Sequence, residues 1–300
     1  MAEYRKIATC FPKAFQTMTA DAPHPDLNAL ARFSARLKNS GAQIVARQHY
    51  RLRAVVCDQP VLIIPLAGEK TVHDVPAPLR ITPGQFVVLH RPQTVDIENR
   101  PEMNDPYRAW CLPFPWPVVE LARQFLQQQA LAAFPSPGER NASRGDLEPL
   151  LPSLFAWLDQ QNADPIQQDY ARLGLLLALA RSGHGDFLRA LAPGLAHRIR
   201  LMVATDPARE WTSAHFETAF NISAATLRRR LVAETTSLRD VLREARLHHA
   251  LALLQTSKLP LKSIALASGY RSQSSFRQNF SDRFGLSPAD VAGVGIGSNP

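Results

Sequence analysis

Cysteine is scarce in this chain, and its three cysteines are not arranged for a disulfide framework or a zinc site. Cys10, Cys57 and Cys111 form no CxxC pair and have no metal-ligand spacing to a histidine. Small disulfide scaffolds and zinc fingers are therefore not indicated. The sequence instead predicts reduced thiols and a cytoplasmic protein, because disulfides are rare in that compartment.

Long hydrophobic runs are missing as well. The longest apolar run covers residues 173–180, whereas a helix that crosses a bilayer needs roughly 20 residues. The first residues of the chain contain no apolar core of signal-peptide length. We therefore expect no membrane partner.

Catalytic signatures are absent too, since the sequence has no GxSxG, Walker, GxGxxG or HExxH motif. A metal-dependent cupin enzyme stays open as an alternative, but it needs histidines and a carboxylate that converge on one ion. His49, His73 and His90 are far apart along the chain and form no HxH pair. We predict no catalytic residue, metal ligand or cofactor, and we expect Cys57 and Cys111 to be small core side chains.

Positive charge is concentrated towards the C-terminal end. Residues 186–300 hold 15 Lys and Arg against 9 Asp and Glu, a net charge of +6, while residues 1–185 hold 19 against 17, a net charge of +2. A basic segment of this kind favours a polyanionic partner, although a solvated basic face has the same composition.

The first half of the chain contains one segment with helical spacing and one with short β-rich runs. Residues 26–40 have helical spacing, and residues 42–115 alternate short β-rich runs with Pro, Gly, Asp and Asn turns. The β-rich runs are 53–57, 61–65, 85–89, 94–97 and 107–112. Pro83-Gly84 is a turn signal before one of them. The pattern predicts a small barrel or sandwich.

Helical periodicity returns over 118–133, 147–161 and 166–181, with a turn-rich loop over 135–146 between the first two. The third segment carries an apolar stripe at helical spacing, made of Ile166, Tyr170, Leu173, Leu177 and Ala180. This stripe is a candidate dimer surface, although such helices can equally cap the strands. Two glycines within residues 182–185 interrupt the helical sequence and predict a linker.

A nine-residue pattern occurs twice in the C-terminal third, at an offset of 49 residues. It runs from Ser223 to Leu231 and again from Ser272 to Phe280, with Ser, a large apolar residue, Arg and a second large apolar residue at matching places. Each copy follows a short helical segment and a sharp turn, for which Asn221 and Gly269 are the left-handed candidates. Each copy therefore predicts the second helix of a helix-turn-helix.

The helical wheel of each copy places polar side chains opposite the apolar ones. Arg pairs bidentately with guanine, Gln with adenine, and Ser with either base edge or a phosphate. Ser223 and Ser272 stand at the N-cap positions and are predicted to bind an amide of the helix or a phosphate. The DNA-contacting residues predicted from the wheel are Ala225, Thr226, Arg228, Arg229, Ser274, Arg277 and Gln278, while Gln273 turns partly toward the core.

The segment between the copies has the length that two DNA grooves require. Residues 237–255 keep helical apolar spacing, and 19 residues at 1.5 Å each make a rod of roughly 28 Å. This length approaches the pitch of B-DNA, about 34 Å, so two recognition helices can address successive major grooves of double-stranded DNA.

The C-terminal hundred residues resemble the AraC/XylS family of bacterial transcriptional regulators. The match is densest in the second unit, and its landmarks include Gly269-Tyr270, Ser272, Phe276, Phe280 and Ser287-Pro288. The resemblance also implies that Gln273 contacts DNA. The first unit departs from the family pattern. Asn221 stands for Gly, Leu231 stands where Phe is usual, Thr235 lies near an expected Gly, and Val241 lies near an expected Tyr.

The resemblance implies an α+β protein with an N-terminal cupin-like β-barrel plus helices and a C-terminal all-α domain with two helix-turn-helix units joined by a long helix. The predicted domains are 1–181 for effector binding and dimerisation, 182–192 as linker, 193–292 for DNA binding, and 293–300 as tail. The implied function is transcription activation more than repression, as a homodimer that recruits RNA polymerase and responds to a small-molecule effector. Control by a protein partner is the alternative, as is a cupin enzyme with an appended DNA-binding module.

Overall fold

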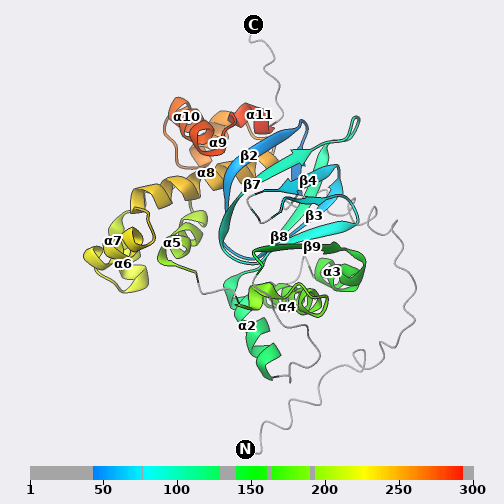
Figure 1. Cartoon of the computed structure of the whole chain (residues 1–300). Helices are drawn as coiled ribbons and strands as arrows, with labels where there is room; N and C mark the ends of the chain where they lie inside the picture. The colour runs from blue at the N-terminus through cyan, green and yellow to red at the C-terminus, as the bar shows by residue number, and fades with distance from the viewer. Residues whose placement is uncertain are drawn as a thin grey trace, which may run out of the picture.

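A computed structural model describes residues 43–73, 75, 77–128, 140–160, 164–189 and 193–292. The predicted helix over 26–40, Cys10 and the predicted tail lie outside the described residues. Strands fill the first part of the described chain and helices fill the C-terminal part (Figure 1). The predicted α+β class is therefore confirmed.

The strands form two antiparallel sheets that face each other across an apolar interior. One sheet has the order β1-β8-β3-β6-β9 and the other the order β2-β7-β4-β5. The strands are β1 Gln43–Ala46, β2 Tyr50–Cys57, β3 Val61–Ala67, β4 Glu69–Val72, β5 Leu79–Ile81, β6 Gln85–Leu89, β7 Gln93–Arg100, β8 Tyr107–Pro113 and β9 Ala142–Asp146. The two sheets are hydrogen-bonded separately, so the cupin-like unit is not closed into one barrel.

The five-stranded sheet is covered on both faces, as its near-continuous apolar runs require. On β3, Leu62 and Ile64 point to one apolar cluster, and Ile63 between them belongs to the cluster on the other face. The turn predicted at Pro83-Gly84 is present, with Gly84 at φ +90° and Gln85 N donating to Thr82 O at 3.1 Å.

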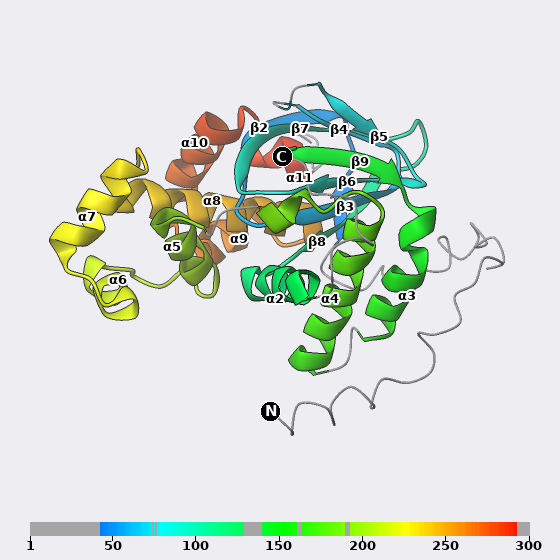
Figure 2. The same ribbon diagram turned by 60° about the horizontal axis from the view of Figure 1, so that its bottom comes forward.

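Three helices lie side by side against the outer face of this sheet (Figure 2). They are α2 Trp116–Gln128, α3 Leu151–Asp159, which follows the 3-10 helix η4 Glu148–Leu150, and α4 Pro165–Arg181. Trp157 of α3 packs on Trp110 of β8 with ring centroids 4.6 Å apart. Helices were predicted at these three places and are found there, although residues 129–133 lie outside the described part.

The loop predicted over residues 135–146 is wrong at its C-terminal end, because Ala142–Asp146 form strand β9, while residues 140 and 141 are irregular as predicted. This strand adds to the free edge of β6 with Gln85 opposite Asp146 and Leu89 opposite Ala142. Ser143 anchors it, since its Oγ lies 2.7 Å from His90 Nε2 and 2.8 Å from His184 Nδ1. The pairing with β6 and the buried Ser143 hydroxyl therefore stabilise a strand here, although the composition of the segment is typical of a turn.

The apolar stripe of α4 divides into an outer and an inner part. Ile166 and Tyr170 are 78% and 67% exposed, whereas Leu173 and Leu177 are half-buried against the helix–sheet core and Ala180 is buried. Only the N-terminal end of the predicted face is therefore open to a partner.

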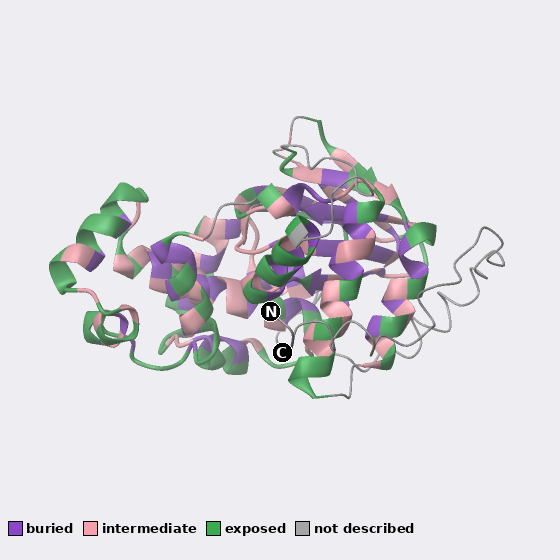
Figure 3. Cartoon of the chain, turned by 90° about the horizontal axis from the view of Figure 1, so that it is seen from below, coloured by how far each residue is buried: buried purple, intermediate pink, exposed green. Residues whose placement is uncertain are grey.

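In residues 193–292, the described C-terminal part, all the regular elements are helices. They are α5 Leu195–Ala204, α6 Ser213–Phe220, α7 Ala224–Ala233, α8 Leu238–Thr256, α9 Leu261–Ala267, α10 Gln273–Phe284 and α11 Pro288–Ala292. Helices α5, α6, α7 and the first half of α8 enclose one core. The second half of α8 and helices α9 to α11 share a core with the interior between the two sheets. Figure 3 shows that buried residues occur in the strands and in the helices alike.

The contacts between the strand part and the C-terminal helices are polar as well as apolar. Asp58, between β2 and β3, binds Arg200 of α5, with its Oδ2 2.7 Å from the Arg200 Nε. Val56 N donates to His248 Nε2 of α8 at 2.9 Å. Gln255, near the end of α8, donates to the Tyr50 hydroxyl at 3.1 Å.

The predicted linker contains a short ordered element. Residues Asp186–Arg189 form the 3-10 helix η5, in which Asp186 and Phe187 are buried and Phe187 joins the core of the N-terminal helices. The domain boundaries stay a prediction. Among the described helices, none combines the length and the apolarity that a membrane crossing needs.

Candidate nucleic-acid interface

The first helix-turn-helix consists of α6, a turn and α7. Asn221 ends α6 in the left-handed conformation at φ +50°, which asparagine tolerates better than most residues. Ser223 caps α7, and its Oγ accepts from Thr226 N at 3.3 Å. Leu227 and Leu231 are buried on the inner side of α7. The predicted turn, cap and core residues of this unit are confirmed.

The second helix-turn-helix consists of α9, a turn and α10. Gly269 takes φ +78° in the turn, and a Cβ there would lie only 2.6 Å from Pro207 O. Ser272 caps α10, because its Oγ accepts from Ser275 N at 3.4 Å. Phe276 and Phe280 are fully buried. The sequence repeat therefore corresponds to a structural repeat with the same cap and the same buried face.

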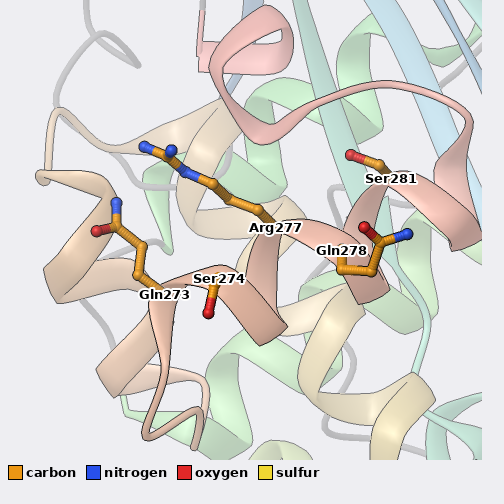
Figure 4. A pocket seen from close by; sticks show the side chains of 5 residues that line it. All are labelled: Gln273, Ser274, Arg277, Gln278 and Ser281. Carbon is orange, nitrogen blue, oxygen red and sulfur yellow. The ribbon is translucent and has the colours of Figure 1, made fainter.

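The predicted DNA-contacting side chains lie on the outer faces of α7 and α10. The exposed ones are Ala225, Arg228, Arg229, Ser274, Arg277 and Gln278, and the half-buried ones are Thr226 and Gln273. Figure 4 shows Gln273, Ser274, Arg277, Gln278 and Ser281 around one shallow hollow along α10. The structure thus gathers the predicted residues of each unit on one face, while their contact with DNA stays a prediction.

Two residues of the α10 face were not predicted. Ser281 lines the hollow one turn after Arg277, and Asp282 accepts from Gln278 Nε2 at 2.8 Å. Asp282 therefore orients the Gln278 amide and leaves its oxygen outward. The signal in the sequence is the i, i+4 spacing of both pairs, which puts their side chains on one face.

The charges of α7 are available to an anionic partner. Arg228 and Arg229 are exposed, and no described carboxylate lies within ion-pair distance of either. Phosphate contacts need free guanidinium groups of this kind. The α7 face is therefore the more basic of the two.

Helix α8 joins the two units as predicted. Its 19 residues begin after the N-cap Ser237, whose Oγ accepts from Asp240 N at 3.2 Å. Helices α6 and α7 lie at one end of α8, and α9 and α10 lie at the other (Figure 1). A helix of this length is a rod of roughly 28 Å.

The strand histidines are closer in space than their positions in the sequence indicate. Because β2 and β4 flank β7, His49 Nε2 and His73 Nε2 both reach Glu98, at 2.6 Å and 3.2 Å from its two oxygens. Burial raises the pKa of the Glu98 carboxyl, but hydrogen bonds from His49, His73 and Arg100 outweigh it and lower this pKa to about 2. Within the described residues, no group of three His, Cys, Asp or Glu has metal-ligand geometry.

A Ser143, His90 and Asp186 group has the composition of a hydrolytic triad but not its geometry. His90 Nε2 lies 2.7 Å from Ser143 Oγ and 3.6 Å from Asp186 Oδ2, so one ring nitrogen faces both partners. A triad needs the acid on the other ring nitrogen. His90 and Asp186 are also fully buried, and the group serves to hold β9 and η5 together.

The two described cysteines, Cys57 and Cys111, have apolar surroundings. Both pack against the interior cluster between the sheets. Burial raises the pKa of the Cys57 thiol to about 12 and that of the Cys111 thiol to about 11. Since the thiolate is the reactive form, these side chains are poor nucleophiles.

Comparisons with known proteins agree with this arrangement. Residues 217–293 match the family model described as a helix-turn-helix domain. The regulator GadX of Escherichia coli K12 is 30% identical over 103 residues, which are 34% of this chain and 38% of GadX. The activator CsvR of Escherichia coli is 32% identical over 91 residues, or 30% of this chain and 34% of CsvR. The matched segments therefore span little more than a third of these relatives.

A structural likeness extends over more of the chain. The structure of ToxT from Vibrio cholerae with a bound unsaturated fatty acid superposes with a TM-score of 0.55 at 16% identity, covering 86% of this chain and 96% of ToxT. At this identity the likeness concerns the fold, and it includes the cupin-like strand unit as well as the C-terminal helices. The C-terminal helices of this chain are a double helix-turn-helix domain of the AraC/XylS type.

Proposed function

We propose that this protein is a sequence-specific transcriptional regulator that inserts α7 and α10 into successive major grooves of double-stranded DNA. The observation that carries the proposal is the structural repeat, in which two capped helices at the ends of one rod expose the predicted polar residues. Arg229 and Gln278 read base edges, and Ser223, Ser272 and Arg228 bind the backbone. Activation, through RNA polymerase, is the proposed mode, since CsvR is named as an activator.

The strand unit is proposed to receive a small-molecule effector. Its support is the fold shared with ToxT, which has been seen with a bound unsaturated fatty acid. Control by a protein partner is the alternative, and a thermal-shift screen against candidate effectors separates the two. We further propose that the protein works in the cytoplasm, as a homodimer, and has no enzymatic activity.

Selection of bound sequences from a random DNA pool tests the central proposal. The full-length protein is expected to enrich a site with two half-sites about one helical turn apart, since α8 sets their separation. Its affinity for this site is expected to fall steeply between low and physiological salt, because a net charge of +6 over residues 186–300 implies several phosphate contacts. No enriched motif together with a flat salt dependence would contradict the proposal.

A further inference from the structure

An arginine of the strand unit lies at the end of the polar face of α10. Ser274, Gln278 and Ser281 follow one another on this face at spacings of four and three residues, so they form one row along the helix. Gly285, four residues further, takes the next place in the row but has no side chain. A Cβ built on Gly285 would lie 3.2 Å from both Cδ and Nε of Arg53. Arg53 of β2 therefore occupies the place that a side chain at Gly285 would take.

The position of Arg53 relative to α10 is fixed by contacts on both sides of it. Helix α10 packs against β2 (Figure 1). Gln48, just before β2, donates through Nε2 to Asp290 O of α11 at 2.5 Å. Further along β2, Val56 N donates to His248 Nε2 of α8 at 2.9 Å. The strand is thus attached to the second helix-turn-helix unit before and after Arg53.

Strand β2 is also distorted next to Arg53. The register of β2 against β7 shifts between Leu52 and Val55, so that two residues of β2 face one residue of β7. A β-bulge of this kind changes the direction of a side chain. Ala54, in the bulge, has φ +51°, a strained conformation for a residue other than glycine. The Asp96 carboxylate stabilises it, because its Oδ1 accepts from Ala54 N at 2.8 Å.

The Arg53 guanidinium is available to an anion. Arg53 is exposed, and no carboxylate of the described residues lies within ion-pair distance of it. Arg51, two residues earlier on the same strand, differs in this respect, since its Nη2 donates to Asp96 Oδ2 at 2.9 Å. Guanidinium groups bind phosphates through two parallel hydrogen bonds. Of these two arginines, Arg53 is therefore the one that can accept a phosphate without breaking an existing ion pair.

The length of α10 brings its end to the DNA backbone. The helix has 12 residues and is a rod of roughly 18 Å, whereas the major groove of B-DNA is about 12 Å wide. A helix that lies across the groove therefore has its ends close to the phosphates that border the groove. Ser272 caps one end of α10, and the Arg53 guanidinium lies beside the other end.

We propose that Arg53 binds a DNA phosphate at the edge of the major groove that receives α10, so that the strand unit is itself part of the DNA interface. The inference rests on the proposed function and adds a contact from outside the C-terminal helices. Arg53 positions α10 and reads no base, since a phosphate contact carries no sequence information directly.

Titration of the full-length protein against its selected site over a range of salt concentrations tests the contact. Arg53→Gln is expected to lower the affinity about tenfold at low salt, as loss of a hydrogen bond between charged groups implies. The slope of log K against log salt concentration is expected to become shallower by about 0.9, the value for one phosphate. Arg53→Lys keeps the charge and is expected to keep the slope. Arg80→Gln is the matched control, because its side chain is 65% exposed on β5, at the opposite edge of the same sheet, and is expected to change neither quantity.

Neutral DNA linkages separate a phosphate contact from a purely structural role of Arg53. Methylphosphonates are placed one at a time along the half-site at which Gln278→Ala loses specificity. One position is expected to weaken binding of the wild type but not of Arg53→Gln, because the variant has already lost that contact. The contact is overturned if Arg53→Gln has the wild-type salt slope, or if every linkage weakens both proteins equally. A wild-type protein that selects no DNA site would instead contradict the proposed function.

Discussion

Arg229 and Gln278 occupy corresponding places on α7 and α10, opposite the buried leucines and phenylalanines. Replacement of either by Ala is expected to cost about 1–3 kcal/mol of binding free energy on the selected site and to relax specificity at one base pair. Titration against the selected site and its single-base variants measures both effects. Arg181→Ala, an exposed arginine at the end of α4, is the control and is expected to change neither. Equal loss on all sequences would identify the residue as a phosphate contact.

Thr235, directly after α7, has a backbone conformation that suits glycine. Its φ is +55°, and a β-branched residue is strained in this region. Thr235→Gly is expected to raise the free energy of unfolding by about 1 kcal/mol, because the strain outweighs the entropy that glycine loses. Urea unfolding checks this. Thr205→Gly, at an ordinary φ of −72°, is expected to destabilise the protein, and an equal response of both variants would show that Thr235 is unstrained.

The turn between α9 and α10 depends on glycine for two reasons at once. Gly269 has a positive φ, and a Cβ there would meet Pro207 O at 2.6 Å and Arg246 Nε at 2.8 Å. Gly269→Ala is therefore expected to lower the free energy of unfolding by about 1–3 kcal/mol and to weaken DNA binding.

Gly174→Ala is the matched control for this change. Gly174 lies within α4, and a Cβ there would have no neighbour within 4 Å. Alanine in mid-helix is expected to stabilise the protein by about 1 kcal/mol. Thermal unfolding compares the two variants, and opposite shifts are expected. If both shifts are positive, the turn does not need glycine.

At the scale of the element, the positions of the helices and the central strands could be predicted from the sequence. Which elements pack or pair with one another could not. Periodicity located α4, α8 and α10 because each buries a stripe of apolar side chains. It did not locate β9, since this strand owes its state to the edge of β6. The approach of His49 and His73 through Glu98 depends on strand order in the same way. Partners that come from distant parts of the chain leave no local period in the sequence.

At the scale of the whole molecule, the open end of α4 is the proposed dimer surface. Ile166→Asp combined with Tyr170→Asp is expected to give a folded monomer with DNA affinity reduced about tenfold or more. In a dimer, binding of one DNA-binding domain raises the local concentration of the second domain near the DNA, and this gain is lost in the monomer. These residues are chosen over Leu173 and Leu177, which contribute to the core. Sedimentation measures the oligomeric state. Met103→Asp, at a fully exposed residue, is the control, and a wild-type protein that is monomeric both free and on DNA would remove the dimer.

The contact of His248 with the strand unit is expected to weaken in acid. Burial holds the pKa of His248 below its ordinary value of 6.5, where Phe284, Glu244, Arg283 and Asp58 surround it. The neutral ring accepts from Val56 N, and protonation removes this acceptor. Since the opened form binds the proton more readily, the contribution of His248 is complete above pH 6.5 and is lost as the pH falls below it.

Thermal unfolding at pH 7.5 and pH 5.5 measures this loss. His248→Gln retains an acceptor that does not titrate, so its melting temperature is expected to fall less than that of the wild type. Gln127→Asn, at an exposed residue of α2 that does not titrate, is the control, and its melting temperature is expected to fall as much as that of the wild type. Identical falls in all three proteins would place the acid sensitivity elsewhere.

The division of the C-terminal helices between two cores has a consequence for how the molecule opens. Helices α5 to α7 have a core of their own, whereas α9 to α11 share theirs with the strands. Regions that share a core unfold together, and regions with a separate one open at lower free energy. The amide hydrogens of α10 should consequently exchange with solvent deuterium as slowly as those of β7, and the amide hydrogens of α7 should exchange first.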